Sequence, residues 1–371
     1  MAGTGSLMRR LRKPPMVVDY ADDLRLFKSR LGKAGILVVA VLYLWLPGYL
    51  PDFELSIFNE AGMFAIGAIG LNLLTGYTGQ VSLGHAFFLA IGAYTWAHFG
   101  GEQQMALPVW LVLSAVFGAI VGAVVGPFAL RLRGNYLAIV SLGLVFIGSH
   151  IWNNWDSVTG GASGVSGDRA ASVGSLDFAN LHLGGKGYTR EQGYFWLIWA
   201  VVALSALVAK NIVRTRPGRA LQAIRDRDVA AAVIGVDAAR YKVAAFALSG
   251  AFAAVSGALL GSYRGYISPD EWNLLLSIQF IAIIIVGGVG TIFGSVLGAL
   301  FVAGAPLLIE EYASSIPLVS WLTDAGGMAT DTFNQLLFGV VIILFLVLEP
   351  HGLAGIWFRL KAYVKAWPFS Y

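Results

Sequence analysis

The sequence contains no cysteine and few charged residues for its length. With no cysteine among 371 residues, neither a disulfide bond nor a thiolate metal site can form. Charged residues make up 12% of the chain, whereas soluble globular domains average about 25%. So small a charged fraction cannot cover a water-facing surface, and it predicts a protein of the lipid bilayer.

Motifs for nucleotide or metal chemistry are missing as well. No segment reads Gly-x-x-x-x-Gly-Lys-Ser/Thr, and the Gly185-Lys186 pair is followed by Gly187. The five histidines all lie more than four residues apart, so no His-Glu-x-x-His site exists. A membrane enzyme would need clustered His, Asp or Glu residues at one interface, and we find none. We therefore expect no catalytic residue, no metal and no cofactor bound by this chain.

The chain is 57% hydrophobic, and ten apolar segments can be drawn along it. Because about 20 helical residues cross a hydrocarbon core, we predict an all-α polytopic membrane protein with about ten transmembrane helices. The membrane domain covers residues 34–350, between cytoplasmic tails at 1–33 and 351–371. The predicted segments are 34–50, 57–75, 82–99, 108–130, 135–152, 193–213, 243–263, 274–289, 294–309 and 334–349.

The eighth and ninth segments are the shortest, at 16 residues each. Sixteen helical residues rise only about 24 Å, less than the hydrocarbon core. The pair is either two short tilted helices or a re-entrant loop, and a re-entrant loop would leave eight spans. The break between them is formed by Gly287, Gly288, Gly290 and Gly294.

Basic and acidic residues concentrate in different loops, and this distribution predicts the orientation of the chain in the membrane. The loops and tails assigned to the cytoplasm hold 21 of the 25 Lys and Arg residues, and the outside loops hold 13 of the 21 acids. Cytoplasmic loops of membrane proteins carry the excess of Lys and Arg, so both termini are expected inside. The same sorting explains a pI of 9.2 without nucleic acid as a partner. Only Glu60 lies well within a span, which argues against an ion-coupled carrier.

Two loops are long enough to have roles of their own. The outer loop, 153–192, has eight glycines and no helical period, so we expect it to be irregular. The inner loop, 214–242, should form a short helix, a charged turn and a second short helix that Gly235 closes. Its arginines could bind anionic lipid headgroups. The following mixture of Asp226, Asp228, Val229 and Val233 favours docking on a cytoplasmic protein instead.

A polar, glycine-rich run interrupts the second apolar segment at 75–80 and continues into the third. Polar groups in a membrane helix need protein or water around them. They therefore either line a translocation path or bond to neighbouring helices beside an ordinary turn. The candidate path residues are Asn72, Thr75, Gln80, Ser82, His85 and Tyr94.

Glycine spacing adds two further expectations. Gly76-x-x-Gly79 and Gly287-x-x-Gly290 each precede a helix of small residues, as corresponding points of an inverted repeat would. Gly118, Gly122 and Gly126 recur every four residues, which makes a flat helix face for close packing.

These motifs together resemble the permeases of branched-chain amino acid ABC importers, in particular the M-type (LivM) family. The similarity runs from about Asn59 to the end of the chain. It is carried by Leu71–His85, Arg133–Gly143, Thr159–Val165, Pro217–Gly235, Glu349–Gly355 and Trp367–Tyr371.

The resemblance implies a heteromeric importer in the bacterial inner membrane. Its partners would be a sister permease, two cytoplasmic ATPases that bind ATP and Mg, a periplasmic binding protein and membrane lipid. The solute would be a branched-chain amino acid, although permeases for urea, short amides or aromatic acids look similar. A stand-alone channel or carrier is the alternative class.

The inner loop then resembles the coupling segment of ABC permeases, residues 217–235. The family's Glu-Ala-Ala-x-x-x-Gly reads Val229-Ala-Ala-x-x-x-Gly235 in this chain, so the contact of that Glu does not carry over. Residues of the coupling segment expected to meet an ATPase are Pro217, Gly218, Arg219, Leu221, Ile224, Arg225, Asp228, Val229, Ala230, Ala231 and Gly235.

Overall fold

The computed structural model describes residues 30–131, 135–167, 171–174, 176–183, 186–313, 339–340, 342–343, 347–349 and 352–366. They belong to two compact units, which are treated separately here. One unit is Asp52–Ile356, and the other comprises the chain ends, Met1–Pro51 and Trp357–Tyr371. In the second unit the structure describes α3 (Arg30–Trp45), η1 (Leu46–Gly48) and the later part of α17 (Gly352–Ala366).

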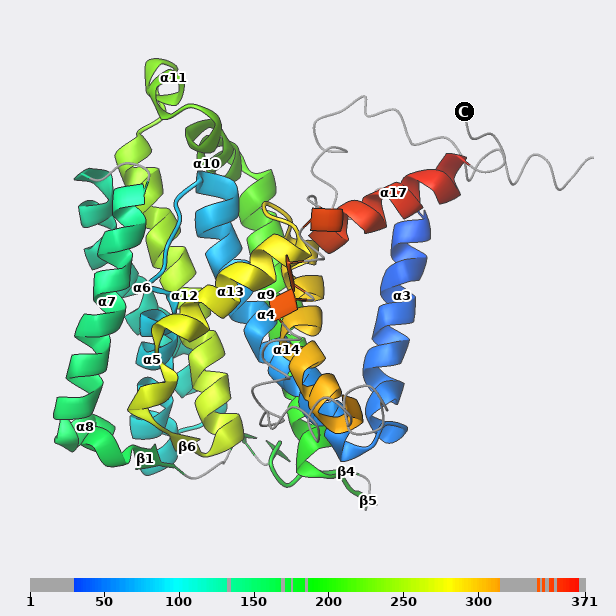
Figure 1. Cartoon of the computed structure of the whole chain (residues 1–371). Coiled ribbons are helices and arrows are strands. Elements are labelled where there is room, and N and C mark those ends of the chain that lie inside the picture. Colours follow the sequence, from blue (N-terminus) through cyan, green and yellow to red (C-terminus); the bar gives the residue numbers. More distant parts are fainter. Residues whose placement is uncertain are drawn as a thin grey trace, which may run out of the picture. The chain divides into compact units, whose positions relative to one another are not determined.

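The larger unit is helical, with short strands in its loops (Figure 1). Its longer helices are α4 (Asp52–Thr78), α5 (His85–Thr95), α6 (Leu107–Arg131), α7 (Asn135–Asn154), α9 (Arg190–Arg214), α10 (Arg216–Asp226), α12 (Ala238–Arg264), α13 (Leu274–Gly287) and α14 (Ile292–Ala313). Shorter turns are the π-helical η2 (Trp96–Glu102), α8 (Asp156–Thr159), η3 (Gly161–Ser163), α11 (Asp228–Val233) and η4 (Pro269–Glu271).

The predicted helical membrane class agrees with this architecture. Among the described residues, five helices are long and apolar enough to cross a bilayer, namely α4, α6, α7, α9 and α12. A sixth span results if α13 and α14 count as one bent span. Of the other predicted segments, 34–50 and 82–99 correspond to shorter helices, and most of 334–349 lies outside the described residues. The number of ten spans therefore stays a prediction.

Helix α4 forms the centre of the unit. It is apolar on every side and almost wholly buried, as expected for a helix surrounded by other helices. In contrast, α6 and α7 leave large apolar side chains such as Val124 and Phe146 exposed, at 61% and 63%. Such side chains suit a surface that faces lipid tails.

The glycine face on α6 packs against α12 as predicted. A Cβ at Gly118 or Gly122 would collide with the carbonyl oxygens of Gly250 and Phe246 respectively. At Gly126 it would lie 2.9 Å from the Cα of Val243. Small residues thus bring the two backbones into direct contact, which is how membrane helices gain packing energy without a hydrophobic driving force.

The outer loop contains short strands rather than being wholly irregular. Strand β1 (Val165–Ser166) pairs antiparallel with β6 (Tyr266–Ile267), which joins the loop to the segment after α12. Two further pairs are β2 (Ser172–Val173) with β3 (Leu176–Asp177), and β4 (His182–Leu183) with β5 (Lys186–Gly187). Strands β1 and β6 lie at one end of the long helices, and α10 and α11 lie at the other (Figure 1).

The break between α13 and α14 falls at the predicted glycines. The two helices are bent by 120° across a gap of four residues. Gly288 and Gly290 have φ values of +119° and +81°, which a residue with a Cβ rarely adopts. The predicted alternatives, two short tilted helices or a re-entrant loop, both stay open.

Candidate functional site

The first half of the coupling segment packs onto the helices beneath it. Pro217 stands in the first turn of α10, where its missing N–H costs no hydrogen bond. A Cβ at Gly218 would collide with the Val213 carbonyl at the end of α9, so this turn is held tightly against α9. Leu221 and Ile224 are 2% and 4% exposed and form the inward face of the helix. Arg219 lies on the exposed face.

The second half projects away from the helices. Three large apolar side chains there are free of protein contact over most of their surface: Val229, Val233 and Ile234 are 67%, 84% and 75% exposed. Helix α11 and the residue after it carry them at one end of the larger unit (Figure 1). Ala230 is exposed beside them, whereas Ala231 is buried and faces inward. An apolar patch rimmed by charges is typical of a protein-binding surface.

Backbone geometry closes the coupling segment. Gly235 has a φ of +85° and ends the segment in the left-handed conformation, as the sequence predicts. At the other side of α11, the Asp228 carboxylate lies 3.8 Å from Lys242 Nζ on α12. In the chain, α9 directly precedes α10 and α12 directly follows α11, so these two long helices flank the coupling segment.

Asn72 bonds to the α13–α14 break through every polar atom of its side chain. Its Nδ2 donates to the Thr291 carbonyl and to Ser295 Oγ, each at 2.8 Å. Its Oδ1 accepts a hydrogen bond from the Gly290 N–H, also at 2.8 Å. These three bonds satisfy the buried amide, and they connect the end of α4 to a segment more than 200 residues further along the chain.

Two other predicted path residues also bond to backbone atoms. His85 is buried, with Nε2 3.0 Å from the Gly67 carbonyl and its ring 4.9 Å from that of Phe280. Thr75 donates to the carbonyl of Gln80 at 3.0 Å. Helix α4 continues to Thr78, so the break lies at 79–84 rather than at 75–80.

The remaining three are buried at separate places. Ser82 Oγ accepts from the Gly84 N–H at 3.3 Å, and the Tyr94 ring lies 5.0 Å from that of Trp152. Gln80 is 7% exposed, and its Oε1 has no hydrogen-bond partner among the described residues. The six predicted residues thus do not converge on one point of the described structure, and their role in a path stays a prediction.

Gln80 lines a cavity beneath the coupling segment. The cavity has a volume of about 280 Å³ and is open on one side. Its walls come from the end of α4, the start of α7, α10, α11 and the start of α12, and they carry both signs of charge. The lining residues are Thr78, Gly79, Gln80, Leu137, Ile224, Arg225, Asp226, Arg227, Asp228 and Lys242.

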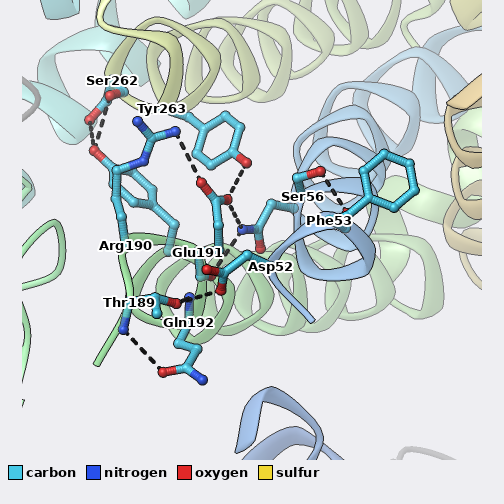
Figure 2. Close-up of polar contacts among 11 residues, drawn as sticks. Asp52, Phe53, Ser56, Thr189, Arg190, Glu191, Gln192, Ser262 and Tyr263 are labelled. Atoms are coloured by element: carbon cyan, nitrogen blue, oxygen red, sulfur yellow. Dashed lines mark hydrogen bonds and ion pairs between the residues drawn. The ribbon is translucent and has the colours of Figure 1, made fainter. Parts of the chain in front are cut away.

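A polar cluster at the opposite end joins α4, α9 and α12 (Figure 2). The Glu191 carboxylate accepts hydrogen bonds from Tyr263 and, at 3.3 Å, from Asn59 Nδ2. The Arg190 guanidinium lies 5.0 Å from the centre of the Tyr263 ring. Thr189 donates to Asp52 at 2.7 Å, and with Gln192 it forms the capping box that starts α9. Sequence patterns did not identify this cluster.

Glu60 lies within the candidate span Asp52–Thr78, as predicted, but it is paired with another charge. Helix α4 begins at Asp52, so Glu60 lies about 12 Å along it. Its carboxylate is 2.9 Å from Arg264, which also pairs with Glu271 at 2.9 Å. Glu60 is thus an ion-paired carboxylate and not a free one. No group of three or more potential metal ligands occurs among the described residues.

Comparison with known proteins gives a consistent set of relatives. Residues 54–346 match the family model described as branched-chain amino acid transport system / permease component. The chain is 28% identical to the high-affinity branched-chain amino acid transport system permease protein LivM of Salmonella typhimurium, over 91% of this chain and 78% of that protein. It is similarly 28% identical to LivM of Escherichia coli, with the same coverage.

The chain is also similar to the second kind of permease in these systems. It is 26% identical to LivH of Salmonella typhimurium, over 79% of this chain and 91% of that protein. No solved structure gives a significant match.

Proposed function

The chain belongs to the family of permease components of branched-chain amino acid transport systems, and from this premise we propose that it is the membrane-spanning permease subunit of an ATP-driven importer. Its cargo is a branched-chain or similarly hydrophobic amino acid, delivered by a periplasmic binding protein. The proposal places the subunit in the bacterial inner membrane.

The observation that carries this proposal is the exposed tip of the coupling segment. Val233 at 84% and Ile234 at 75% exposure lie on the projecting half of a helix pair whose first helix, α10, packs onto α9 and α4. Apolar side chains held out in water by a structured helix pair favour a protein partner. Since the sequence has no phosphate-binding Gly-Lys-Ser/Thr motif, ATP and Mg are assigned to that partner.

The remaining partners follow from the transport class. Similarity to both LivM and LivH supports a sister permease beside this chain. The outer loop, at the opposite end of the long helices from α11, is the surface we assign to the binding protein (Figure 1). Membrane lipid covers the exposed apolar faces of α6 and α7.

In the proposed mechanism, the coupling segment acts as a lever. ATP-driven closure of the two ATPases moves α10 and α11, whose ends continue into α9 and α12. Because α12 packs backbone to backbone on α6 through Gly118 and Gly122, it moves with α6 as a rigid pair. This shift changes the pore from an outward-open to an inward-open arrangement.

Reconstituted transport tests the proposal. We expect proteoliposomes that contain the chain with its sister permease, ATPases and binding protein to take up radiolabelled leucine only when ATP is inside or accessible to the ATPases. Omitting the ATPases or the binding protein should abolish uptake. Leucine uptake by the purified chain alone would contradict the proposal and favour a passive channel. Retained ATP dependence with uptake of urea or an aromatic acid instead would contradict only the assigned cargo.

A further inference from the structure

Two glycines from distant parts of the chain meet beneath the coupling segment. Gly76 lies in the last turn of α4, and Gly290 lies in the break between α13 and α14. A Cβ on Gly76 would be 2.6 Å from the backbone nitrogen of Gly290 and would collide with Asn72 Oδ1. The two backbones therefore touch, and the three hydrogen bonds of Asn72 hold them in register.

One side chain of the coupling segment reaches this junction. Arg225, in the last turn of α10, donates a hydrogen bond from Nη1 to the Gly76 carbonyl. A Cβ on Gly290 would lie 2.9 Å from the same nitrogen, so the guanidinium also lies against the break. The Arg225 stem passes Gly79, where a Cβ would be 3.4 Å from its Cγ.

The chemistry of the contact suits arginine. The Gly76 carbonyl is one of the last four of α4, which the helix itself leaves without donors. These carbonyls carry the negative end of the helix dipole. A guanidinium offers several N–H donors in a rigid plane, so it can hold this oxygen while staying beside Gly290, whereas a lysine ammonium is a mobile point charge.

The position of Arg225 favours a movable contact over a permanent anchor. The residue is exposed and forms part of the wall of the open cavity beneath the segment. The hydrogen bond to Gly76 is only partly buried. Water from the open cavity can take over its polar groups, so the contact can break and re-form as α10 moves. Asn72, by contrast, is 1% exposed and keeps α4 and the break together throughout.

We infer that Arg225 is a positioning residue through which movement of the coupling segment reaches the junction of α4, α13 and α14. Displacement of α10 pulls or releases Gly76 and Gly290 together, and this changes the bend between α13 and α14. The inference rests on the proposed function, because it takes the ATPases as the source of the movement.

Single cysteines can report this movement, since the chain has none of its own. Val289→Cys places a thiol in the α13–α14 break, where the native side chain is 40% exposed. Val233→Cys places one at the tip of α11, at 84% exposure. In the purified complex, the labelling rate of each thiol by a water-soluble maleimide is measured with and without MgATP and vanadate.

Three variants are compared in each single-cysteine background. Arg225→Gln removes the guanidinium, and Arg225→Lys keeps the charge without the planar donors. Arg216→Gln is the matched control, because it makes the same charge change at an exposed residue of the same helix. We expect nucleotide to change labelling at position 289 several-fold in the parent and in the control. Arg225→Gln should abolish this change, and Arg225→Lys should reduce it.

The outcomes separate the inference from the proposed function. If the ATPases protect position 233 but position 289 responds fully in Arg225→Gln, or fails to respond in the parent, the inference is overturned. If position 233 is never protected by the ATPases, the docking of the coupling segment itself fails. Loss of the response at position 289 with protection at 233 intact supports Arg225 as the link.

Discussion

Gly235 shows how one residue can matter through its backbone conformation alone. Apart from its chain neighbours, no atom lies within 4 Å of the point where its Cβ would stand, so a side chain has room there. Its φ of +85° is nevertheless in the left-handed region. That conformation costs a residue with a side chain about 1–2 kcal/mol, and asparagine tolerates it better than other residues.

We therefore predict opposite outcomes for two substitutions of Gly235. Gly235→Val should distort the turn between α11 and α12, so that ATP hydrolysis continues while leucine uptake falls several-fold. Gly235→Asn should keep most of the uptake, because Asn adopts positive φ. Both quantities are measured in the reconstituted complex, and ATPase co-purification checks assembly. Normal uptake by Gly235→Val would contradict the assignment of this turn to coupling.

Some features of single residues could be predicted from the sequence, and others could not. The conformation of Gly235 was predictable, because a glycine after a short helix signals a left-handed cap. The partners of Asn72 were not, since Thr291 and Ser295 lie 219 and 223 positions away and no local pattern encodes such a contact. The same holds for Arg225, whose partner Gly76 is 149 positions away.

At the scale of elements, helix contacts depend on small residues in rows. Gly122 lies in the middle of the α6 glycine face, and any Cβ there would collide with the Phe246 carbonyl on α12. Because the contact joins two backbones, there is no flexible side chain that could move aside to make room for an added Cβ. This packing explains why the chain needs so many of its 46 glycines in helices, where glycine is otherwise unfavourable.

We predict that Gly122→Leu separates α6 from α12 and lowers the stability of the folded protein. Overpacking typically costs about 1–3 kcal/mol, and a clash with backbone should lie at the upper end of that range. Stability is measured as the temperature at which the detergent-solubilised protein loses its monodisperse chromatographic peak. Val124→Leu on the same helix is the control, because Val124 is 61% exposed and its face is free. Equal stability of the two variants would contradict the proposed helix contact.

Element boundaries were predictable where glycines mark them. The α13–α14 break follows from its glycines. The predicted segment 193–213 missed the first residues of α9, which begins at Arg190 after the Thr189 capping box. The third predicted segment, 82–99, was less accurate: the helix begins at His85 and continues as a π-helical turn to Glu102. In this turn Trp96 packs against Gly261 of α12, a tertiary contact that hydropathy cannot report.

At the scale of the whole molecule, the distribution of Lys and Arg residues agrees with the direction in which the long helices run. The inner loop with its seven Lys and Arg residues lies at one end of the long helices in the larger unit, and β6 lies at the opposite end (Figure 1). Loops that stay in the cytoplasm carry excess Lys and Arg, because positive charge opposes translocation. Composition therefore predicts the orientation of the molecule even where it leaves the number of spans open.

This orientation gives a prediction that the absence of cysteine makes simple to test. Val233→Cys at the α11 tip and Tyr266→Cys in β6 would each be the only thiol in the chain, at positions 84% and 46% exposed. In intact spheroplasts, a membrane-impermeant maleimide should label position 266 and not position 233. After permeabilisation of spheroplasts that lack the ATPases it should label both, which also shows that both thiols are reactive when the coupling segment is uncovered. Labelling of position 233 in sealed spheroplasts would place the coupling segment outside, where no ATPase could reach it, and the importer mechanism would fail with it.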